Sequence, residues 1–219
     1  MQLKFLPSFV KRKGRITKKQ IQSLSSLSEF SVKSIQEVED FSKHFDKCYL
    51  EIGFGNAENI IFQAINNPSY LFIGSEVYMS GIGTLVSSIK ENNINNIKIF
   101  SDDIRLLLDQ SRKKVFDSVI IICPDPWPKE KHHKRRLINK SFLEMVHDFM
   151  KDDSNIYIST DWENYAESIS ELFVKNKLFK PSSNKSFQKD SLSKFERRGK
   201  DEGRELSLIH ISEPTRLSV

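Results

Sequence analysis

The sequence predicts an α/β fold, in which a doubly wound and mostly parallel sheet carries helices on both faces. From Tyr49 onward, short apolar segments alternate with longer amphipathic ones, which is typical of repeated strand–helix units. The segment DSVIIIC (residues 117–123) is apolar almost throughout, as expected of a central strand that is covered on both sides. The connections are short, and right-handed crossovers then give the doubly wound arrangement.

The individual elements follow from this alternation. The predicted strands are the segments CYLEIG, YLFIGSE, IKIFS, DSVIIIC and NIYIST. Helices are predicted near residues 57–67, 78–92, 104–113, 136–150 and 162–176. In the helix at 136–150, the apolar positions 138, 142, 145, 146 and 149 form a single stripe. Residues 1–44 are predicted to be a basic, partly helical N-terminal extension, and residues 45–219 the main domain.

Charge is concentrated in two blocks. The 219 residues carry a net charge of +5, from 34 basic and 29 acidic side chains. The blocks are KRKGRITKK (residues 11–19) and KEKHHKRR (residues 129–136), whereas the stretch between them is closer to balanced. Together they suggest an electrostatic footprint for a polyanion, although either block alone is equally typical of solvated surface.

Cysteine usage and hydropathy indicate a compartment. Cys48 and Cys123 each adjoin an apolar, strand-like segment, which is the pattern of reduced, buried cysteines in a cytoplasmic protein. The first 15 residues contain no long apolar stretch, and no run of about 18 apolar residues occurs. We therefore expect neither a signal peptide nor a membrane span. The Cys and His residues have no metal-type spacing, so no metal is expected.

The first strand end carries a glycine turn. In the segment LEIGFGNAENI, Gly53 and Gly55 form a tight strand-to-helix turn that lets a ligand approach the backbone, because ligands of such folds bind at the carboxyl ends of the strands. A nicotinamide fingerprint would require glycine at its sixth position, where this chain has Glu58, which argues against an oxidoreductase. Glu51 lies two residues before the first glycine. A carboxylate there suits a cationic ligand better than a phosphate.

The next two strand ends also carry acids. Glu76 lies about 20 residues beyond the glycine turn, where an acid can accept hydrogen bonds from both ribose hydroxyls. Asp102 and Asp103 follow the third strand, where an acid can accept from the exocyclic amine of adenine. Each acid alone is also typical of a helix N-cap. Acids at three successive strand ends are harder to explain as caps.

The fourth strand is followed by CPDPWPKEKHHKRRLINKSF (residues 123–142). Its prolines stiffen a loop that holds Asp125 at the switch region of the sheet, and Trp127 is expected to serve as an apolar wall or a base-stacking face. In the predicted helix 136–150, Lys134, Arg135 and Arg136 load the first turn, where each cation opposes the helix dipole at a cost of about 0.3–1 kcal/mol. That cost is reasonable if the cluster binds phosphates.

Taken together, the segments FVKRKGRITKKQ, LEIGFGN, GSEVYMSGIG, PDPWPKEKHHKRR, TDWENYA and KFERRG resemble the bacterial tRNA (guanine-N7-)-methyltransferases. The resemblance runs from about residue 8 to residue 199. It implies a Rossmann-like class I methyltransferase fold, S-adenosylmethionine as the methyl donor, and tRNA as the partner. It also implies methyl transfer to N7 of a guanine at position 46, in the variable loop.

The same resemblance implies the roles of individual residues. The cofactor site would be lined by Glu51, Gly53, Gly55, Glu76, Asp103 and Asp125, with Asp125 nearest the chemistry and therefore the catalytic residue. The substrate would be contacted by Lys129, Asp161, Ser193, Lys194, Phe195 and Glu196. The RNA backbone would be held by Lys131, His132, His133, Lys134, Arg135 and Arg136.

The chain departs from the family pattern at several positions. Ala57 replaces a third glycine, and we expect a helical backbone there to accommodate it. Ser193 stands in place of threonine, and residues 75 and 78–80 differ around Glu76. The segment LIHISEPTRLSV does not resemble the family's ending, so the relation of the residues after about 205 to the domain is doubtful and no function is assigned beyond Gly203.

Other functions stay open at this point. A non-catalytic RNA-binding protein on a methyltransferase fold would not need the acids at 51, 76 and 103. A methyltransferase for another nucleic acid or for a protein is the nearer alternative, whereas the basic blocks argue against a small-molecule substrate. The sequence does not distinguish a monomer from a homodimer.

Overall fold

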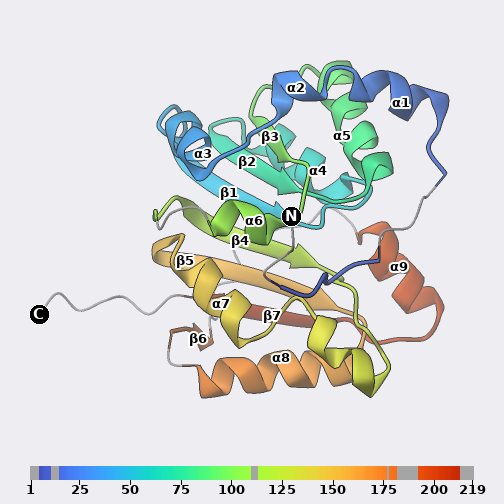
Figure 1. Ribbon diagram of the computed structural model, residues 1–219, viewed down its shortest axis with the longest axis vertical. Helices are drawn as coiled ribbons and strands as arrows, with labels where there is room; N and C mark the ends of the chain where they lie inside the picture. The colour runs from blue at the N-terminus through green and yellow to red at the C-terminus, as the bar shows by residue number, and fades with distance from the viewer. Residues whose placement is uncertain (1–4, 11–14, 110–112, 177, 182–191, 213–219) are drawn as a thin grey trace, which may run out of the picture.

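Figure 1 shows the computed structural model of the chain, which describes residues 5–10, 15–109, 113–176, 178–181 and 192–212. Within these ranges, a seven-stranded sheet has the order β3-β2-β1-β4-β5-β7-β6. The strands are β1 (Lys47–Ile52), β2 (Tyr70–Ser75), β3 (Ile97–Phe100), β4 (Phe116–Ile122), β5 (Met150–Thr160), β6 (Lys180–Pro181) and β7 (Ser207–Ser212). Strands β1 to β5 pair in parallel, and β7 runs antiparallel to β5. The predicted doubly wound, mostly parallel sheet is confirmed.

Helices cover both faces of the sheet. They are α1 (Lys18–Leu24), α2 (Leu27–Phe30), α3 (Ile35–Ser42), α4 (Glu58–Asn66), α5 (Met79–Glu91), α6 (Ile104–Leu108), the 3-10 helix η1 (Glu130–Arg135), α7 (Lys140–His147), α8 (Glu163–Lys175) and α9 (Lys194–Asp201). One buried cluster joins the sheet to α3, α6, α7 and α8. A second joins it to α4 and α5, with α1 and α2 packed at the edge. No described helix has the length and apolar content needed to cross a membrane.

The N-terminal segment contributes to the core. Val32, Ile35 and Val38 are buried in the first cluster, and the Val32 N–H donates to the carbonyl of Ile99 on β3 at 2.9 Å. Residues 27–42 therefore pack against the sheet. The domain boundary at residue 44 stays a prediction, and part of the first basic block (residues 11–14) lies outside the described residues.

The predicted helix at 136–150 is shorter in the structure. The Asn139 side chain accepts the N–H of Phe142 at 3.1 Å, which caps a helix beginning at Lys140. The basic residues lie instead on η1, with Lys134 and Arg135 in its last turn, where cations complement a helix dipole. The expected dipole cost is therefore wrong. The predicted apolar positions 138, 142, 146 and 149 are buried, but 138 and 149 lie outside α7, so the helical stripe is shorter than predicted.

Candidate functional site

The carboxyl ends of β1, β2, β3, β4 and β5 surround a cavity of about 410 Å³. This cavity is called the strand-end cavity below. Its lining includes Gly53, Gly55, Glu76, Asp102, Asp103, Asp125, Asp161, Trp162 and Phe195. The structure thus gathers acids that are far apart in the sequence, in the position where doubly wound folds bind their ligands.

The turn after β1 depends on left-handed backbone. Gly53 and Gly55 have φ of 73° and 53°, and a Cβ on Gly81 of α5 would lie 2.2 Å from the Gly55 carbonyl oxygen. Glycine at 53 and 55 avoids the strain of positive φ, and glycine at 81 allows α5 to approach the turn. Ala57 also has positive φ, at 65°, so the expectation of a helical backbone at this position is wrong.

Glu76 is fixed in the cavity by the backbone. Its carboxylate accepts N–H hydrogen bonds from Gly55 at 2.8 Å, Val77 at 2.7 Å and Tyr78 at 3.0 Å. Burial raises the pKa of Glu76 above its ordinary value, the three N–H groups oppose that shift, and the charge of Asp125 adds to it. The side chain is therefore held rigidly at the ligand-facing surface.

Glu51 lies apart from the strand-end cavity. It is 3% exposed and accepts a hydrogen bond from the Asn59 amide at 2.7 Å. It lines a smaller adjoining cavity of about 20 Å³, which shares Gly53, Gly55 and Phe195 with the larger one. A cationic end of a ligand in the strand-end cavity would reach Glu51 only through this narrow extension.

Asp103 has a partner within the protein. Its carboxylate caps α6 and binds the Arg105 guanidinium, with distances of 2.9 Å to Nε and 2.6 Å to a terminal nitrogen. Both side chains are buried. The neighbouring Asp102 is exposed and also lines the cavity. An adenine amine could therefore donate to the carboxylate of Asp102 or of Asp103, of which Asp103 already accepts hydrogen bonds from Arg105.

The aromatic walls differ from those expected. Trp162 and Phe195 line the strand-end cavity together with the exposed Asp125, whereas Trp127 is not among the lining residues. Trp127 instead donates its indole N–H to the Ser8 carbonyl at 2.9 Å. The sequence analysis assigned Trp162 no role, although the segment TDWENYA contains it. Its place directly after Asp161 was the available signal.

Helix α9 carries the predicted substrate segment to the cavity. Ser193 and Glu196 form a capping box at its start, and Glu196 is 1% exposed with its carboxylate accepting from Ser159 at 2.9 Å. Glu58, the residue that breaks the nicotinamide fingerprint, accepts from the Lys194 N–H and from Arg197, both at 2.8 Å. These contacts hold the exposed ring of Phe195 over Gly55. Phe195 is thus presented to a ligand, whereas Glu196 supports the helix.

Asp161 sits against the other end of α9. It accepts a hydrogen bond from Arg204 Nε at 2.7 Å, and a Cβ on Gly199 would lie 2.6 Å from its carboxylate. The glycine therefore lets the helix pack directly on this acid. Asp161 lines the cavity in a fixed orientation.

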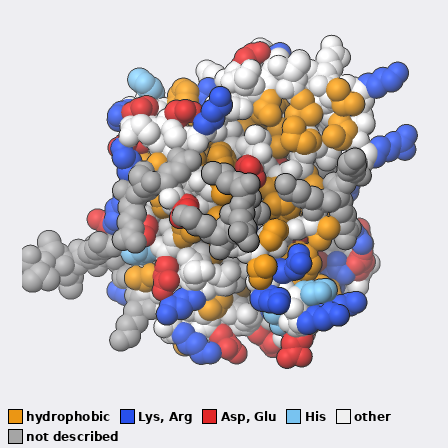
Figure 2. Space-filling model, viewed as in Figure 1, with side chains coloured by type: hydrophobic (Ala, Val, Ile, Leu, Met, Phe, Trp, Pro, Cys, Tyr) orange, Lys and Arg blue, Asp and Glu red, His pale blue; other side chains and the backbone are white. Residues whose placement is uncertain are grey.

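The basic helix η1 adjoins the loop that carries Asp125. Figure 2 shows Lys, Arg and His side chains gathered at the lower right, over this part of the chain. Lys129, Lys131 and Lys134 are exposed, and Arg135 is half-buried. Burial and the surrounding cations lower the pKa of His132 below its ordinary value, which favours the neutral ring.

Arg136 does not face the solvent with the others. It is 5% exposed, donates to the Pro126 carbonyl at 2.9 Å and to the Asn164 side chain at 2.8 Å, and lies over the Tyr165 ring. The prediction that it holds RNA phosphates does not fit this position. Arg136 instead braces the proline-rich loop against α8.

Nothing in the described ranges groups three or more His, Cys, Asp or Glu side chains in a way that could hold a metal ion. The expectation that the site needs no metal stays a prediction.

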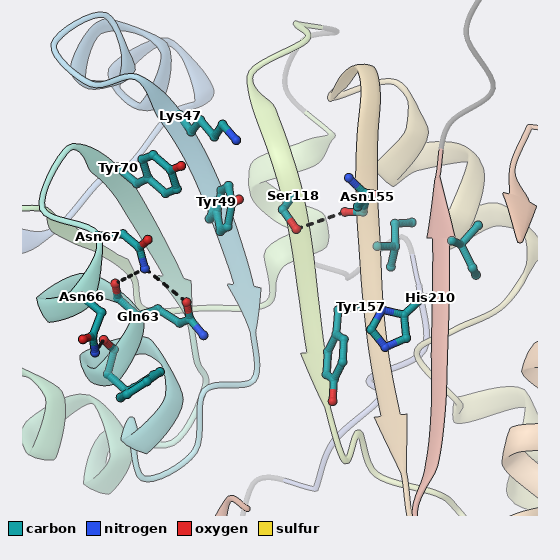
Figure 3. Close-up of a pocket in the computed structure, with 13 residues that line it drawn as sticks. Lys47, Tyr49, Gln63, Asn66, Asn67, Tyr70, Ser118, Asn155, Tyr157 and His210 are labelled. Carbon is teal, nitrogen blue, oxygen red and sulfur yellow. Dashed lines mark hydrogen bonds between the residues drawn. The ribbon is translucent and has the colours of Figure 1, made fainter. Parts of the chain in front are cut away.

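A second cavity, of about 440 Å³, lies over the sheet toward the amino ends of the strands. Figure 3 shows its lining of tyrosines, amides and His210, drawn from β1, β2, β4, β5, β7 and α4. No carboxylate is among the residues that line it. Its position and its side chains therefore do not match the chemistry found at the strand ends.

Sequence comparisons identify the family. A methyltransferase family model (Methyltransf_4) matches residues 46–208. A tRNA (guanine-N(7)-)-methyltransferase of Neorickettsia sennetsu is 36% identical over 75% of this chain and 73% of its own length. The homologue of the same name from Wolbachia pipientis wMel is 35% identical over 85% and 84%. The chain belongs to the tRNA (guanine-N7-)-methyltransferase family. The predicted resemblance is thereby confirmed.

Solved structures agree on the fold of this methyltransferase. The aminoglycoside resistance methyltransferase NpmB1 superposes with a TM-score of 0.57 at 11% identity, covering 84% of this chain and 95% of its own. The 30S ribosomal A1408 methyltransferase from an uncultured bacterium gives a TM-score of 0.55 at 17% identity, covering 84% and 95%. At such identities the likeness shows the Rossmann-like methyltransferase fold and no more.

Proposed function

We propose that the protein transfers a methyl group from S-adenosylmethionine to N7 of a guanine in tRNA, at position 46 of the variable loop. One observation carries the proposal: the strand-end cavity holds the Glu76 carboxylate on three backbone N–H groups and opens beside η1, with Asp125 at its mouth. Family membership supports the choice of RNA and of the guanine nitrogen. The cytoplasmic location and the absence of a metal stay predictions from the sequence.

The residues present fit S-adenosylmethionine. Glu76 offers a fixed carboxylate for two ribose hydroxyls, Asp102 or Asp103 offers an acceptor for the adenine amine, and the glycine turn leaves room for the chain between them. Glu51 lies in the small extension, at the end where an ammonium group would be placed. When bound, S-adenosylmethionine supplies an electrophilic methyl group on a sulfonium.

The acceptor chemistry needs little from the protein beyond position and charge. Guanine N7 has an in-plane lone pair and no proton at neutral pH, so no general base is required. With the cofactor bound, the bond from N7 to the methyl carbon would form as the carbon–sulfur bond broke, and the positive charge would pass to the purine. Asp125 is placed to stabilise that cation by its own charge, while Trp162 and Phe195 offer flat apolar surfaces for the base.

The RNA is proposed to lie on η1. Lys129, Lys131, Lys134 and Arg135 present cations on and just before η1, which follows the loop that carries Asp125. Lys194 adds a further exposed cation at the start of α9, where it lines the small adjoining cavity. In this arrangement the acidic side chains surround the site of methyl transfer, and the Lys and Arg side chains contact the RNA.

A direct test is methyl transfer from labelled S-adenosylmethionine to bulk unmodified tRNA, followed by nucleoside mapping. We expect N7-methylguanosine at position 46, and no product with a transcript carrying adenosine there. A protein that binds the cofactor and tRNA without transferring the methyl group would be a non-catalytic RNA-binding protein. Methylation of another atom or another polymer would also refute the proposal.

A further inference from the structure

The described N-terminal residues 5–10, called the strap below, cross the mouth of the strand-end cavity. In Figure 1 this dark blue segment passes the carboxyl ends of the strands toward α9. Ser8 and Phe9 are part of the cavity lining, although they lie 39 and 38 residues before the start of β1 at Lys47. The sequence placed them in a basic extension without assigning them a role at the site.

Side chains from the segments that follow β2, β3 and β4 hold the strap. The Tyr78 hydroxyl donates to the Val10 carbonyl at 2.8 Å, and the Trp127 indole donates to the Ser8 carbonyl at 2.9 Å. Arg105 donates to the Leu6 carbonyl at 3.1 Å. The acceptors of these three hydrogen bonds are main-chain carbonyls at alternate positions, so the bonds do not depend on which side chains the strap carries.

Two of the anchors, Tyr78 and Arg105, lie next to acids that line the cofactor side of the cavity. Tyr78 follows Glu76 by two residues and donates its backbone N–H to that carboxylate. Arg105 is oriented by the buried carboxylate of Asp103 and stacks over the Phe5 ring at 4.3 Å. A ligand that orders these segments would therefore also order the strap. The ordered strap would in turn obstruct release of the ligand.

Trp127 differs from the other anchors because it also contacts η1. The Arg135 guanidinium lies over its ring at 5.0 Å from the centroid, and the His132 ring meets it edge-on at 5.7 Å. Its backbone is left-handed, with φ of 45°, which a non-glycine residue adopts only where its surroundings enforce it. The indole thus connects the RNA-facing helix on one side with the strap on the other.

We propose that the strap retains the cofactor and that Trp127 is the positioning residue through which RNA on η1 strengthens that retention. The inference rests on the proposed function, because it assumes a cofactor in the strand-end cavity and RNA on η1. RNA bound to η1 orders Arg135, which in turn fixes the Trp127 ring. The fixed indole keeps its hydrogen bond to Ser8, so the strap stays across the cavity. The protein then keeps its methyl donor longest when the acceptor is present.

The test measures release of preloaded, labelled S-adenosylmethionine into an excess of unlabelled cofactor. It uses the full chain, with and without saturating tRNA transcript containing 7-deazaguanosine, which lacks the acceptor N7 and so prevents turnover. The variants are Trp127→Phe and Tyr78→Phe, each of which removes one donor to the strap and keeps an aromatic ring. Tyr70→Phe is the matched control, since Tyr70 lies at the start of β2, away from the strap.

Without RNA, Trp127→Phe and Tyr78→Phe should each release the cofactor roughly fivefold faster than wild type, the effect of one neutral hydrogen bond. Tyr70→Phe should match wild type. RNA should slow release in wild type and in Tyr78→Phe, but not in Trp127→Phe.

Release rates in both strap variants equal to that of Tyr70→Phe would overturn retention by the strap. Equal slowing by RNA in all variants would overturn the role of Trp127. Failure of the wild-type protein to bind the cofactor would instead refute the proposed function, so the two failures are distinguishable.

Discussion

The two sides of the strand-end cavity are built in different ways. On the cofactor side, Glu76 is buried and its carboxylate is oriented by backbone N–H groups. On the RNA side, η1 presents exposed cations on long side chains. A small ligand with fixed hydroxyls is recognised by rigid, desolvated acceptors, whereas a large polyanion is held by adjustable charges. Substitutions on the cofactor side should therefore have large effects on binding that do not depend on salt concentration. Substitutions on the RNA side should have smaller effects on binding that change with salt concentration.

The largest effect is expected at Asp125, where the two sides meet. Asp125→Ala should lower turnover roughly 10²–10³-fold, the scale of one preorganised electrostatic group. Asp125→Asn keeps the shape and one acceptor but loses the charge, so it should fall between Ala and wild type. Single-turnover methylation measures both. The wild-type rate should stay flat from about pH 6.5 to 8.5, because no general base is needed.

A contrary result at Asp125 would change the mechanism. If the rate showed an ionisation near neutrality that Asp125→Asn abolished, proton transfer would matter and the carboxylate would act as a base. Asn as damaging as Ala would point the same way.

Glu76 tests the cofactor side alone. Glu76→Ala should weaken S-adenosylmethionine binding by roughly 2–4 kcal/mol, because two charge-assisted hydrogen bonds to the ribose are lost. Isothermal calorimetry at low and high salt should give the same loss. The prediction fails if the folded variant binds the cofactor as wild type does.

The RNA side should respond to salt. Replacing Lys131, Lys134 and Arg135 with glutamine should weaken tRNA binding, leave cofactor affinity unchanged, and flatten the salt dependence by roughly 0.7–0.9 per lost phosphate contact. Arg136→Gln is the contrasting variant, since its guanidinium is internal and its loss should reduce stability rather than the salt slope. An unchanged slope in the triple variant would make the exposed cluster ordinary solvated surface.

The sequence predicted the sheet well because alternating apolar segments are a local signal, and it predicted the acids at strand ends because the fold brings such ends together. It did not predict where α7 begins, since the Asn139 cap competes with helical continuation from Arg136. Nor did it distinguish Trp127 from Trp162, or the buried Arg136 from the exposed Lys134, because neighbours in sequence point to different partners here. The strap was missed for the same reason: its contacts are all long-range.

The pH dependence of cofactor binding should show how the charge of Asp125 affects the ionisation of Glu76. Glu76 must be ionised to accept two ribose hydroxyls, and its pKa is raised above the ordinary value by burial and by Asp125. Affinity should therefore be lost as pH falls through this raised pKa, at a higher pH than for a glutamate of ordinary pKa. Asp125→Asn removes one of the causes, so the loss should move to lower pH. If the pH midpoint of cofactor binding is the same in Asp125→Asn as in wild type, Asp125 does not influence the ionisation of Glu76.

The smallest effect is expected in the glycine turn, where Gly53 and Ala57 share left-handed backbone but differ in surroundings. At Gly53, φ is 73° and no atom lies within 4 Å of an added Cβ, so Gly53→Ala adds strain without compensating contacts. It should destabilise the fold by roughly 1 kcal/mol.

Ala57 is fully buried at φ 65°, so its methyl contact offsets much of its strain. Ala57→Gly relieves about 1–2 kcal/mol of backbone strain, but it gives up about 0.8 kcal/mol of methyl burial and about 0.4–1 kcal/mol through the freer unfolded chain. The net change should lie within about 0.8 kcal/mol of zero, as measured by urea unfolding. That near-cancellation would explain how this chain holds alanine where the family pattern has glycine. If Ala57→Gly stabilised the protein by more than about 1 kcal/mol, the buried methyl group would contribute nothing to stability. The native alanine would then be destabilising relative to glycine.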